Sequence, residues 1–188
     1  MTDSLVPIQR LIRSVADFPK PGVTFRDVNP LLADAGGFAR CIDALAEPWQ
    51  GSGVQAVCGI ESRGFIFGAA LAQKLHAGFG AALAQKLHAG FVPLRKPGKL
   101  PPPLVTVEYE LEYGRDALQA RSDALKPGER TLIVDDVLAT GGTLAAAREL
   151  VERLDAVLVG ASVLIELPAL NGRARWSGEA PVHSLLRY

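Results

Sequence analysis

Cysteine is scarce in this chain, and an excess of charge of either sign is absent. The 188 residues include two cysteines, and Lys plus Arg equal Asp plus Glu at 20 each. Two cysteines are too few for a disulfide framework, so we expect Cys58, inside the apolar run 54–60, to be a buried, reduced thiol. Because the chain has no overall basic field that would gather nucleic acid or an anionic membrane, any phosphate binding must be local.

Long apolar runs are missing as well. No segment approaches the roughly 18 residues needed to span a bilayer, and the first 15 residues carry Asp3, Arg10 and Arg13 rather than the apolar core of a signal peptide. The Walker sequence Gly-Lys-Ser/Thr is also absent, which disfavours a nucleoside triphosphatase. We therefore expect a cytoplasmic protein with no membrane or nucleic-acid partner, folded as a single domain over 1–188.

Strand and helix patterns alternate along the chain, which predicts an α/β fold with a parallel sheet flanked by helices. Apolar segments rich in β-branched residues predict strands at 54–60, 91–95, 131–136 and 157–165. Helical patterns occur at 5–15, at 37–49, after 64 and after 143.

Residues 104–114 alternate between apolar and polar side chains, which predicts a half-buried strand or hairpin arm. Glu108, Glu110 and Glu112 share its polar face. The pattern alone does not choose a general acid or base among them, and three solvated carboxylates are the leading interpretation.

The most informative stretch, 131–143, joins a buried strand, two adjacent carboxylates and a turn that opens a helix. Asp135 and Asp136 end the strand, where ligands bind in open α/β sheets. Carboxylates there can accept hydrogen bonds from sugar hydroxyls or meet a magnesium ion held mainly by phosphates. Backbone N–H groups, two hydroxyls and the helix dipole of the turn converge on an anion. The turn consists of Ala139, Thr140, Gly141, Gly142 and Thr143. The stretch predicts a site for a ribose that carries a phosphate, and two solvated acids before an ordinary turn are the weaker alternative.

A second strand end with anion-binding chemistry occurs at 59–64. Its backbone N–H groups and Arg63 could hold another phosphate-bearing group, although a capped helix start with a surface arginine also fits the isolated motif. Farther on, Arg95, Lys96 and Lys99 surround a Pro/Gly loop that cannot pair as a strand. This loop is a candidate lid that brings positive charge to a leaving pyrophosphate, whereas a basic loop taken alone is usually solvated.

The chain also contains a tandem repeat, because residues 68–79 recur without one change as 80–91. Solenoid repeats are longer, diverged and numerous, so we interpret the repeat as an in-frame duplication. Twelve extra helical residues would move the helix end by about 18 Å and turn it by about 120°, and the following strand could not reach its place. We expect one copy to form the helix and the other to be extruded near 78–80.

The stretch from Asp135 to Thr143 resembles the phosphoribosyl pyrophosphate signature of the type I phosphoribosyltransferases. Other motifs occur in the order seen in family members that act on adenine: Phe18 to Gly22, Phe25 to Asp27, Glu61 to Phe65, Arg95 to Pro101 and Glu112 to Gly114. The resemblance covers about residues 12–188. It implies the type I phosphoribosyltransferase fold, with a base-binding segment at about 5–35 and a flexible lid loop at about 95–114. The duplication departs from the family pattern near the family's dimer contact.

The resemblance implies that phosphoribosyl pyrophosphate and adenine give AMP and pyrophosphate, with Mg²⁺ as cofactor. Asp135 and Asp136 would meet the ribose hydroxyls, the ion being carried by the donor near them rather than by direct protein ligands. Residues 139–143 would hold the 5-phosphate. The pyrophosphate and its lid would be served by Glu61, Ser62, Arg63, Arg95, Lys96 and Lys99.

For the base, the resemblance implies that Phe25 stacks on adenine while backbone groups of Val23 and Thr24 read its edge. Glu112 and Tyr113 would lie on the catalytic loop, with Glu112 as the candidate for proton transfer, and the chain would form a homodimer. Two alternatives stay open, namely a different purine base and a non-catalytic regulator that senses nucleotides on the same fold.

Overall fold

The structure is a computed structural model that describes residues 5–76, 89–110 and 114–188. Its packing divides the chain into two compact units, Met1–Ala44 and Leu45–Tyr188, and each is described by itself. The expectation of one domain over the whole chain stays a prediction.

The first unit differs from its sequence pattern at the end of its first helix. Its elements are α1 (Val6–Arg10), β1 (Arg13–Val15), β2 (Phe25–Asp27), α2 (Asn29–Ala33) and most of α3 (Ala35–Ala46). The helix predicted over 5–15 is wrong after Arg10, because β1 pairs with β2 in antiparallel register and Arg13 forms an ion pair of 2.5 Å with Asp27. Tertiary pairing over 14 residues therefore overrides a weak local helix preference.

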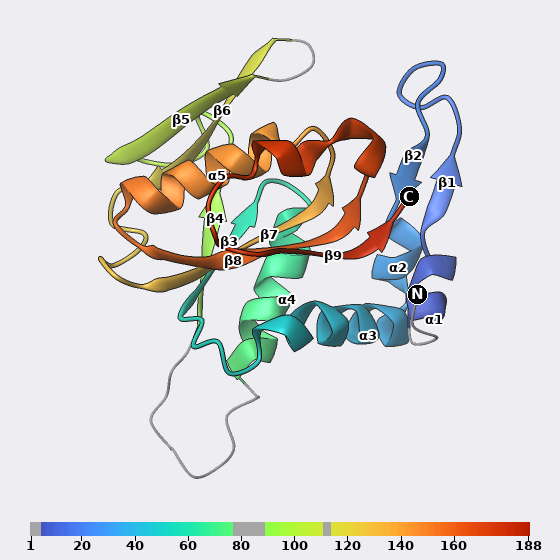
Figure 1. Cartoon of the computed structure of the whole chain (residues 1–188), viewed down its shortest axis with the longest axis horizontal. Helices are drawn as coiled ribbons and strands as arrows, with labels where there is room; N and C mark the ends of the chain where they lie inside the picture. The colour runs from blue at the N-terminus through green and yellow to red at the C-terminus, as the bar shows by residue number, and fades with distance from the viewer. Residues whose placement is uncertain (1–4, 77–88, 111–113) are drawn as a thin grey trace. The chain divides into compact units, whose positions relative to one another are not determined.

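The second unit is built on a five-stranded parallel sheet (Figure 1). Its strands are β3 (Ala56–Ile60), β4 (Gly90–Leu94), β7 (Arg130–Leu138), β8 (Val157–Glu166) and β9 (Val182–Arg187), in the spatial order β4-β3-β7-β8-β9. The four predicted strands are confirmed. The edge strand β9 was not predicted.

Helices cover both faces of this sheet. From β3 the chain passes through α4 (Gly64–His76) to one edge, and from β7 it passes through α5 (Gly142–Arg153) toward the other edge. Right-handed crossovers in opposite directions place the two helices on opposite faces, as Figure 1 shows. The parallel sheet flanked by helices is therefore confirmed.

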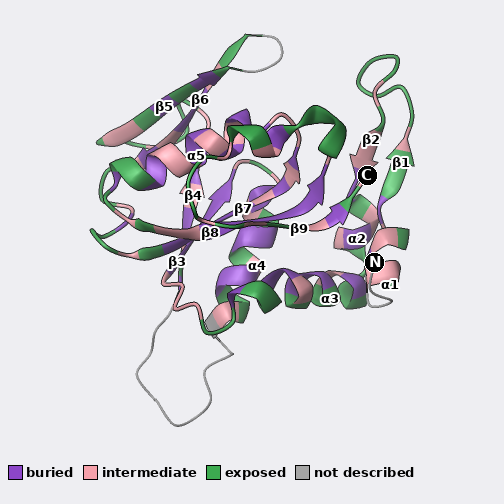
Figure 2. Cartoon of the chain, in the orientation of Figure 1, coloured by how far each residue is buried: buried purple, intermediate pink, exposed green. Residues whose placement is uncertain are grey.

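A hairpin packs on the outer side of α5 (Figure 1). It consists of β5 (Leu104–Glu110) and β6 (Arg115–Arg121), which confirms the predicted arm and adds its partner. Val107 and Tyr109 are buried, while Glu108 and Glu110 are exposed, as the alternation predicts. Figure 2 shows that β3 and most of β7 are buried, whereas the edge strand β9 is mostly intermediate or exposed. Three short 3-10 helices complete the unit: η2 (Glu47–Trp49), η3 (Pro168–Leu170) and η4 (Gly172–Arg175).

The two copies of the duplication contribute different elements to this unit. Helix α4 ends at His76 in the first copy, and β4 begins at Gly90 in the second copy. Phe91 of the second copy packs against α4, since a Cβ on Gly68 would lie 3.0 Å from its ring. The expected extrusion near 78–80 lies outside the described residues.

The sequence predicts a buried, reduced Cys58 and no apolar run long enough to span a bilayer. Cys41 and Cys58 are buried and free, and burial raises the pKa of Cys41 to about 12. No helix within 5–76, 89–110 or 114–188 is long and apolar enough to cross a membrane.

Candidate functional site

The candidate site lies at the carboxyl ends of β3 and β7, which are neighbours in the sheet. Connections leave these two strands toward opposite edges, so the strand order reverses between them. In open α/β sheets the crevice at such a reversal is where ligands bind. The loops that follow the two strands, 61–64 and 139–142, are the two loops that the sequence identified as anion-binding.

The loop after β7 has the geometry of an anion cradle. Gly141 has a φ of +83° and precedes the first residue of α5, so the unpaired N–H groups of the first helical turn face the loop. A cavity of about 50 Å³ opens beside it. The cavity is lined by Val137, Leu138, Ala139, Thr140, Gly141, Thr143 and Leu144.

Backbone atoms of η4 support this loop from behind. A Cβ on Gly141 would lie 2.2 Å from the carbonyl oxygen of Gly172, and a Cβ on Gly172 would lie 2.2 Å from that of Ala139. Both positions therefore need glycine. Gly172 was not identified from the sequence, although Asn171-Gly172 after a strand is a turn signal.

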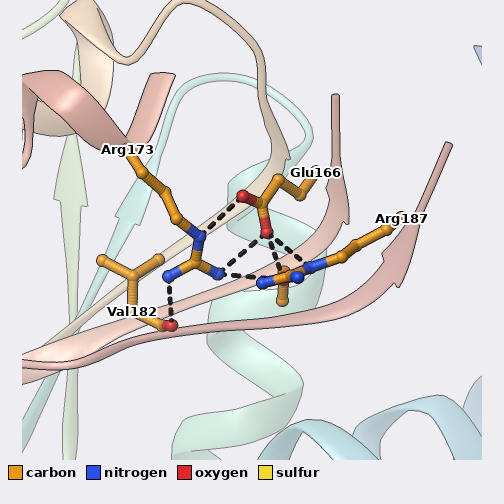
Figure 3. Close-up of polar contacts among 5 residues, drawn as sticks. Glu166, Arg173, Val182 and Arg187 are labelled. Carbon is orange, nitrogen blue, oxygen red and sulfur yellow. Dashed lines mark hydrogen bonds and ion pairs between the residues drawn. The ribbon is translucent and has the colours of Figure 1, made fainter. Parts of the chain in front are cut away.

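A buried carboxylate anchors η4 (Figure 3). Glu166 accepts hydrogen bonds from Arg173 Nε at 2.6 Å and Nη2 at 2.8 Å, from Ser184 Oγ at 2.5 Å and from Arg187 Nε at 3.1 Å. Arg173 also donates to the carbonyl of Val182 at 2.9 Å. The hydrogen bond from Arg173 is the main reason that the pKa of Glu166 falls to about 2. The anionic form of Glu166 thus holds the turn that backs the phosphate loop.

The loop after β3 meets the acidic pair of β7. A Cβ on Gly64 would lie 2.9 Å from Asp135 Oδ1, so the start of α4 packs directly on the end of β7. Arg63 Nε lies 2.9 Å from Asp136 Oδ2. Burial, and then the neighbouring charge of Asp136, raise the pKa of Asp135 well above its ordinary value. Burial also raises the pKa of Asp136, against the opposing charge of Arg63.

Glu61 connects the loop after β3 to the basic residues that follow β4. Its carboxylate accepts hydrogen bonds from Arg95 Nε and Nη2 at 3.2 and 3.0 Å, and from the backbone N–H of Lys96 at 2.9 Å. The bond from Arg95 is the main cause of the lowered pKa of Glu61. Arg95 also donates to the carbonyl of Lys99 at 3.3 Å. The side chains of Ser62 and Lys99 are exposed.

The ammonium group of Lys96 points to the hairpin. It donates to the hydroxyl of Tyr109 and to Oδ2 of Asp116, and it lies 5.0 Å from the centre of the Tyr109 ring. Lys96, Arg95 and Arg63 each have a carboxylate partner within the chain. The structure thus joins Arg95 and Lys96 through Glu61, while Arg63 pairs with Asp136. A bound pyrophosphate would have to share these cations with their carboxylate partners or displace the carboxylates.

The expected base-binding residues lie in the first unit. Phe25 opens β2 and meets the ring of Phe18 edge to face at 5.2 Å, and Phe18 is 52% exposed. Val23 N–H donates to the carbonyl of Lys20, and the Val23 carbonyl accepts from Phe18 N–H. Thr24 is exposed. The Val23 N–H is therefore used within its own turn, whereas its carbonyl retains a second lone pair.

Glu112 and Tyr113 lie outside the described residues. The flanking residues are Glu110, the last of β5, and Gly114, which has a φ of +98° just before β6. Glu110 pairs with Arg115 across the hairpin.

Residues 32–177 match the family described as "Phosphoribosyl transferase domain". The chain belongs to the phosphoribosyltransferase family. This phosphoribosyltransferase is 51% identical over 177 residues to the adenine phosphoribosyltransferase of Xanthomonas campestris pv. campestris (strain B100). The matched residues cover 94% of this chain and 89% of that protein.

Solved structures agree with the expected fold of this phosphoribosyltransferase. Adenine phosphoribosyltransferase from Rhodothermus marinus DSM 4252 superposes with a TM-score of 0.87 at 45% identity, over 98% of each chain. The enzyme from Saccharomyces cerevisiae, described in complex with D-2,5-dideoxy-2,5-imino-altritol 1,6-bisphosphate and adenine, gives 0.87 at 36% identity over 99% of this chain and 100% of that one. The type I phosphoribosyltransferase fold is confirmed.

Proposed function

We propose that this phosphoribosyltransferase transfers the phosphoribosyl group of phosphoribosyl pyrophosphate to adenine, giving AMP and pyrophosphate. One observation carries the proposal: the two loops predicted to bind the donor's phosphates follow adjacent parallel strands, and Arg63 of the first loop pairs with Asp136 near the end of the second strand. The relatives named above, all adenine phosphoribosyltransferases, favour adenine as the base.

The roles of the donor-site residues follow from charge. The 5-phosphate sits on the N–H groups and hydroxyls of 139–143, and Asp135 and Asp136 accept hydrogen bonds from the ribose hydroxyls. Asp136 Oδ2 is buried and lies 2.9 Å from Arg63 Nε, so a ribose hydroxyl would share this oxygen with the guanidinium group. Because bond cleavage builds negative charge on the pyrophosphate, Arg63 stabilises the leaving group.

Magnesium fits this site as a companion of the donor. No group of three His, Cys, Asp or Glu side chains in the described part of the chain could hold an ion alone. The acidic pair offers only two carboxylates, one of them paired with Arg63. When bound, Mg²⁺ supplies charge neutralisation at the pyrophosphate oxygens.

The base and proton-transfer residues complete the proposal. Phe25 stacks on adenine, and backbone groups of Val23 and Thr24 read its edge. Glu112 manages the purine proton on a catalytic loop that also includes Tyr113, and this proton transfer contributes about 10² to 10⁴ in rate. Closure of the hairpin excludes water, which would otherwise attack the cation-like ribose.

We also propose that the chain acts as a cytoplasmic homodimer. The support for the dimer is the family resemblance and Ile66 of α4, a large apolar residue that is 43% exposed. Light scattering after size-exclusion chromatography would give the mass directly. A monomer at micromolar concentration would contradict the dimer.

The reaction is tested by incubating the chain with phosphoribosyl pyrophosphate, Mg²⁺ and each purine base in turn. We expect AMP from adenine and much less nucleotide from hypoxanthine, xanthine or guanine. Product from hypoxanthine but not adenine would assign another base. Donor binding without product from any base would support the regulator, and a nucleic-acid shift assay would then test that alternative.

A further inference from the structure

We propose that Asp116 is a positioning residue for this reaction: it holds the Lys96 ammonium against the hairpin and so fixes the end of the β5–β6 ladder relative to the loop after β3. The inference rests on the proposed function, because the position of Lys96 matters to catalysis only if the pyrophosphate binds beside it. Asp116 was not identified from the sequence. It lies on β6, where a charged residue on a half-exposed strand gives no signal of its own.

The position of Asp116 in the hairpin is the first step. Asp116 pairs with Tyr109 across the two strands, and the next pair, Glu110 with Arg115, is the last before the tip. Asp116 therefore lies one residue pair from the end of the ladder. A side-chain contact at this level stabilises the last cross-strand pairs of the hairpin, because side-chain pairs across the strands hold a hairpin together.

Three groups meet at this level. The Lys96 ammonium donates to both Asp116 Oδ2 and the Tyr109 hydroxyl, and Tyr109 donates to the same Asp116 oxygen at 3.3 Å. Asp116 Oδ1 accepts from the N–H of Ala117 at 2.8 Å, which orients the carboxylate. The Lys96 and Asp116 side chains are 32% and 28% exposed. This partial burial makes the pair stronger than a pair on the open surface.

Lys96 is tied to the pyrophosphate loop from its other side. Its backbone N–H donates to Glu61, which also holds Arg95. Arg95 and Gln119 exchange two backbone hydrogen bonds of 2.8 and 2.7 Å, which join the residues after β4 to β6. A continuous path of short contacts thus runs from Glu61, through Lys96, to Asp116 beside the tip.

The Lys96 ammonium group has enough N–H donors to contact the hairpin and the pyrophosphate at the same time. It carries three N–H donors, and the contacts to Tyr109 and Asp116 use two of them. The third can meet a pyrophosphate oxygen without release of the hairpin. Asp116 therefore places Lys96 where one cation serves both the leaving group and the hairpin.

Asp116→Asn tests this role, because it keeps the shape and removes the charge. We expect kcat for AMP formation to fall about 10-fold. The Kd for phosphoribosyl pyrophosphate should stay within about threefold of the wild-type value or become smaller, because the variant removes a negative charge near the pyrophosphate. Tyr109→Phe, which keeps the ring and removes one hydroxyl, should give a smaller loss of the same kind.

The matched control is Asp123→Asn. Asp123 pairs with Arg121 at 2.8 Å just beyond the other end of β6, away from the tip. The kcat of the Asp123→Asn variant should stay within about twofold of the wild-type value. Amide hydrogen exchange of 104–110 and 115–121 gives a readout that needs no catalysis: it should be faster in Asp116→Asn than in Asp123→Asn.

The outcomes are separable. An unchanged kcat in Asp116→Asn, or a donor Kd that weakens in parallel with kcat, overturns the inference, and so does unchanged hydrogen exchange. If the wild-type chain makes no AMP, the proposed function fails. The inference fails instead if the wild type is active and Asp116→Asn behaves like Asp123→Asn.

Discussion

Arg63 Nε lies 2.9 Å from Asp136 Oδ2, so the loop after β3 and the strand β7 each contribute one partner to an ion pair. The Asp136 side chain is 9% exposed, whereas that of Arg63 is 37% exposed. Removing one partner of such a pair leaves a buried charge without compensation, which costs more than the pair itself is worth.

We expect Arg63→Met to lower the free energy of unfolding by about 1–2 kcal/mol at pH 7.5. Without Arg63, the pKa of Asp136 rises further above its unfolded value of about 4. A carboxyl group whose pKa is raised by folding loses stability as pH increases, so the deficit should shrink as pH falls toward 4.5. Urea denaturation at pH 7.5 and pH 4.5 measures this loss of stability. The control is Arg153→Met, because Arg153 forms an exposed ion pair with Glu149. A deficit independent of pH would exclude this mechanism.

Gly141→Ala should weaken donor binding by at least about 10-fold, because a side chain at a φ of +83° is strained and its Cβ meets the carbonyl of Gly172. Gly128→Ala is the matched control, since Gly128 has a φ of +77° with open space around it. Titration calorimetry with phosphoribosyl pyrophosphate compares the two variants, and thermal melting confirms that each is folded. Equal affinities would mean that the η4 contact does not set the phosphate loop.

Glu166→Gln should destabilise the chain at neutral pH by about 2 kcal/mol, less than the full pKa shift implies because its arginine partners are partly exposed. A carboxyl group whose pKa is lowered by folding contributes stability above its unfolded pKa of about 4.3 and loses it as pH falls toward 2. Wild type and variant should therefore converge in acid. A gap as large at pH 2.5 as at pH 7 would assign the effect to packing.

Glu112→Gln should lower kcat by about 10² or more and change the Kd for the donor little, because proton transfer matters only in the transition state. Glu108→Gln, at an exposed glutamate of β5, is the control and should stay near wild type. Steady-state kinetics with adenine, together with donor titration, separates the two effects. Unchanged turnover in Glu112→Gln would remove Glu112 from this role.

Deleting residues 77–88 leaves one copy of the duplicated sequence, because the two copies are identical. Helix α4 and strand β4 would keep every residue they have now. We expect the shortened chain to fold, to make AMP within about threefold of the full chain, and to melt no more than about 4 °C higher, since loop length has a small effect on stability. Failure to fold would show that the second copy is required.

Much of the sheet could be predicted from the sequence because each strand carries its own apolar pattern. The segments 54–60, 91–95, 131–136 and 157–165 all form parallel strands. Strand β1 and edge strand β9 could not be predicted in this way, because a short or half-exposed strand is stabilised by its partner rather than by its own residues. Sequence patterns therefore worked where a strand carries its own apolar run or a regular alternation of apolar and polar residues.

The same division applies to the site. The sequence by itself determined where the anion loops lie, since paired acids, Gly/Thr turns and helix starts are local chemistry. Only the tertiary structure decided that Arg63 faces Asp136, that Lys96 faces Asp116, and that Gly172 backs Gly141. These contacts join residues far apart in the chain. The parallel sheet brings the first and third pairs together because its strand ends are aligned, whereas the bridge between Arg95 and Gln119 brings Lys96 to the hairpin.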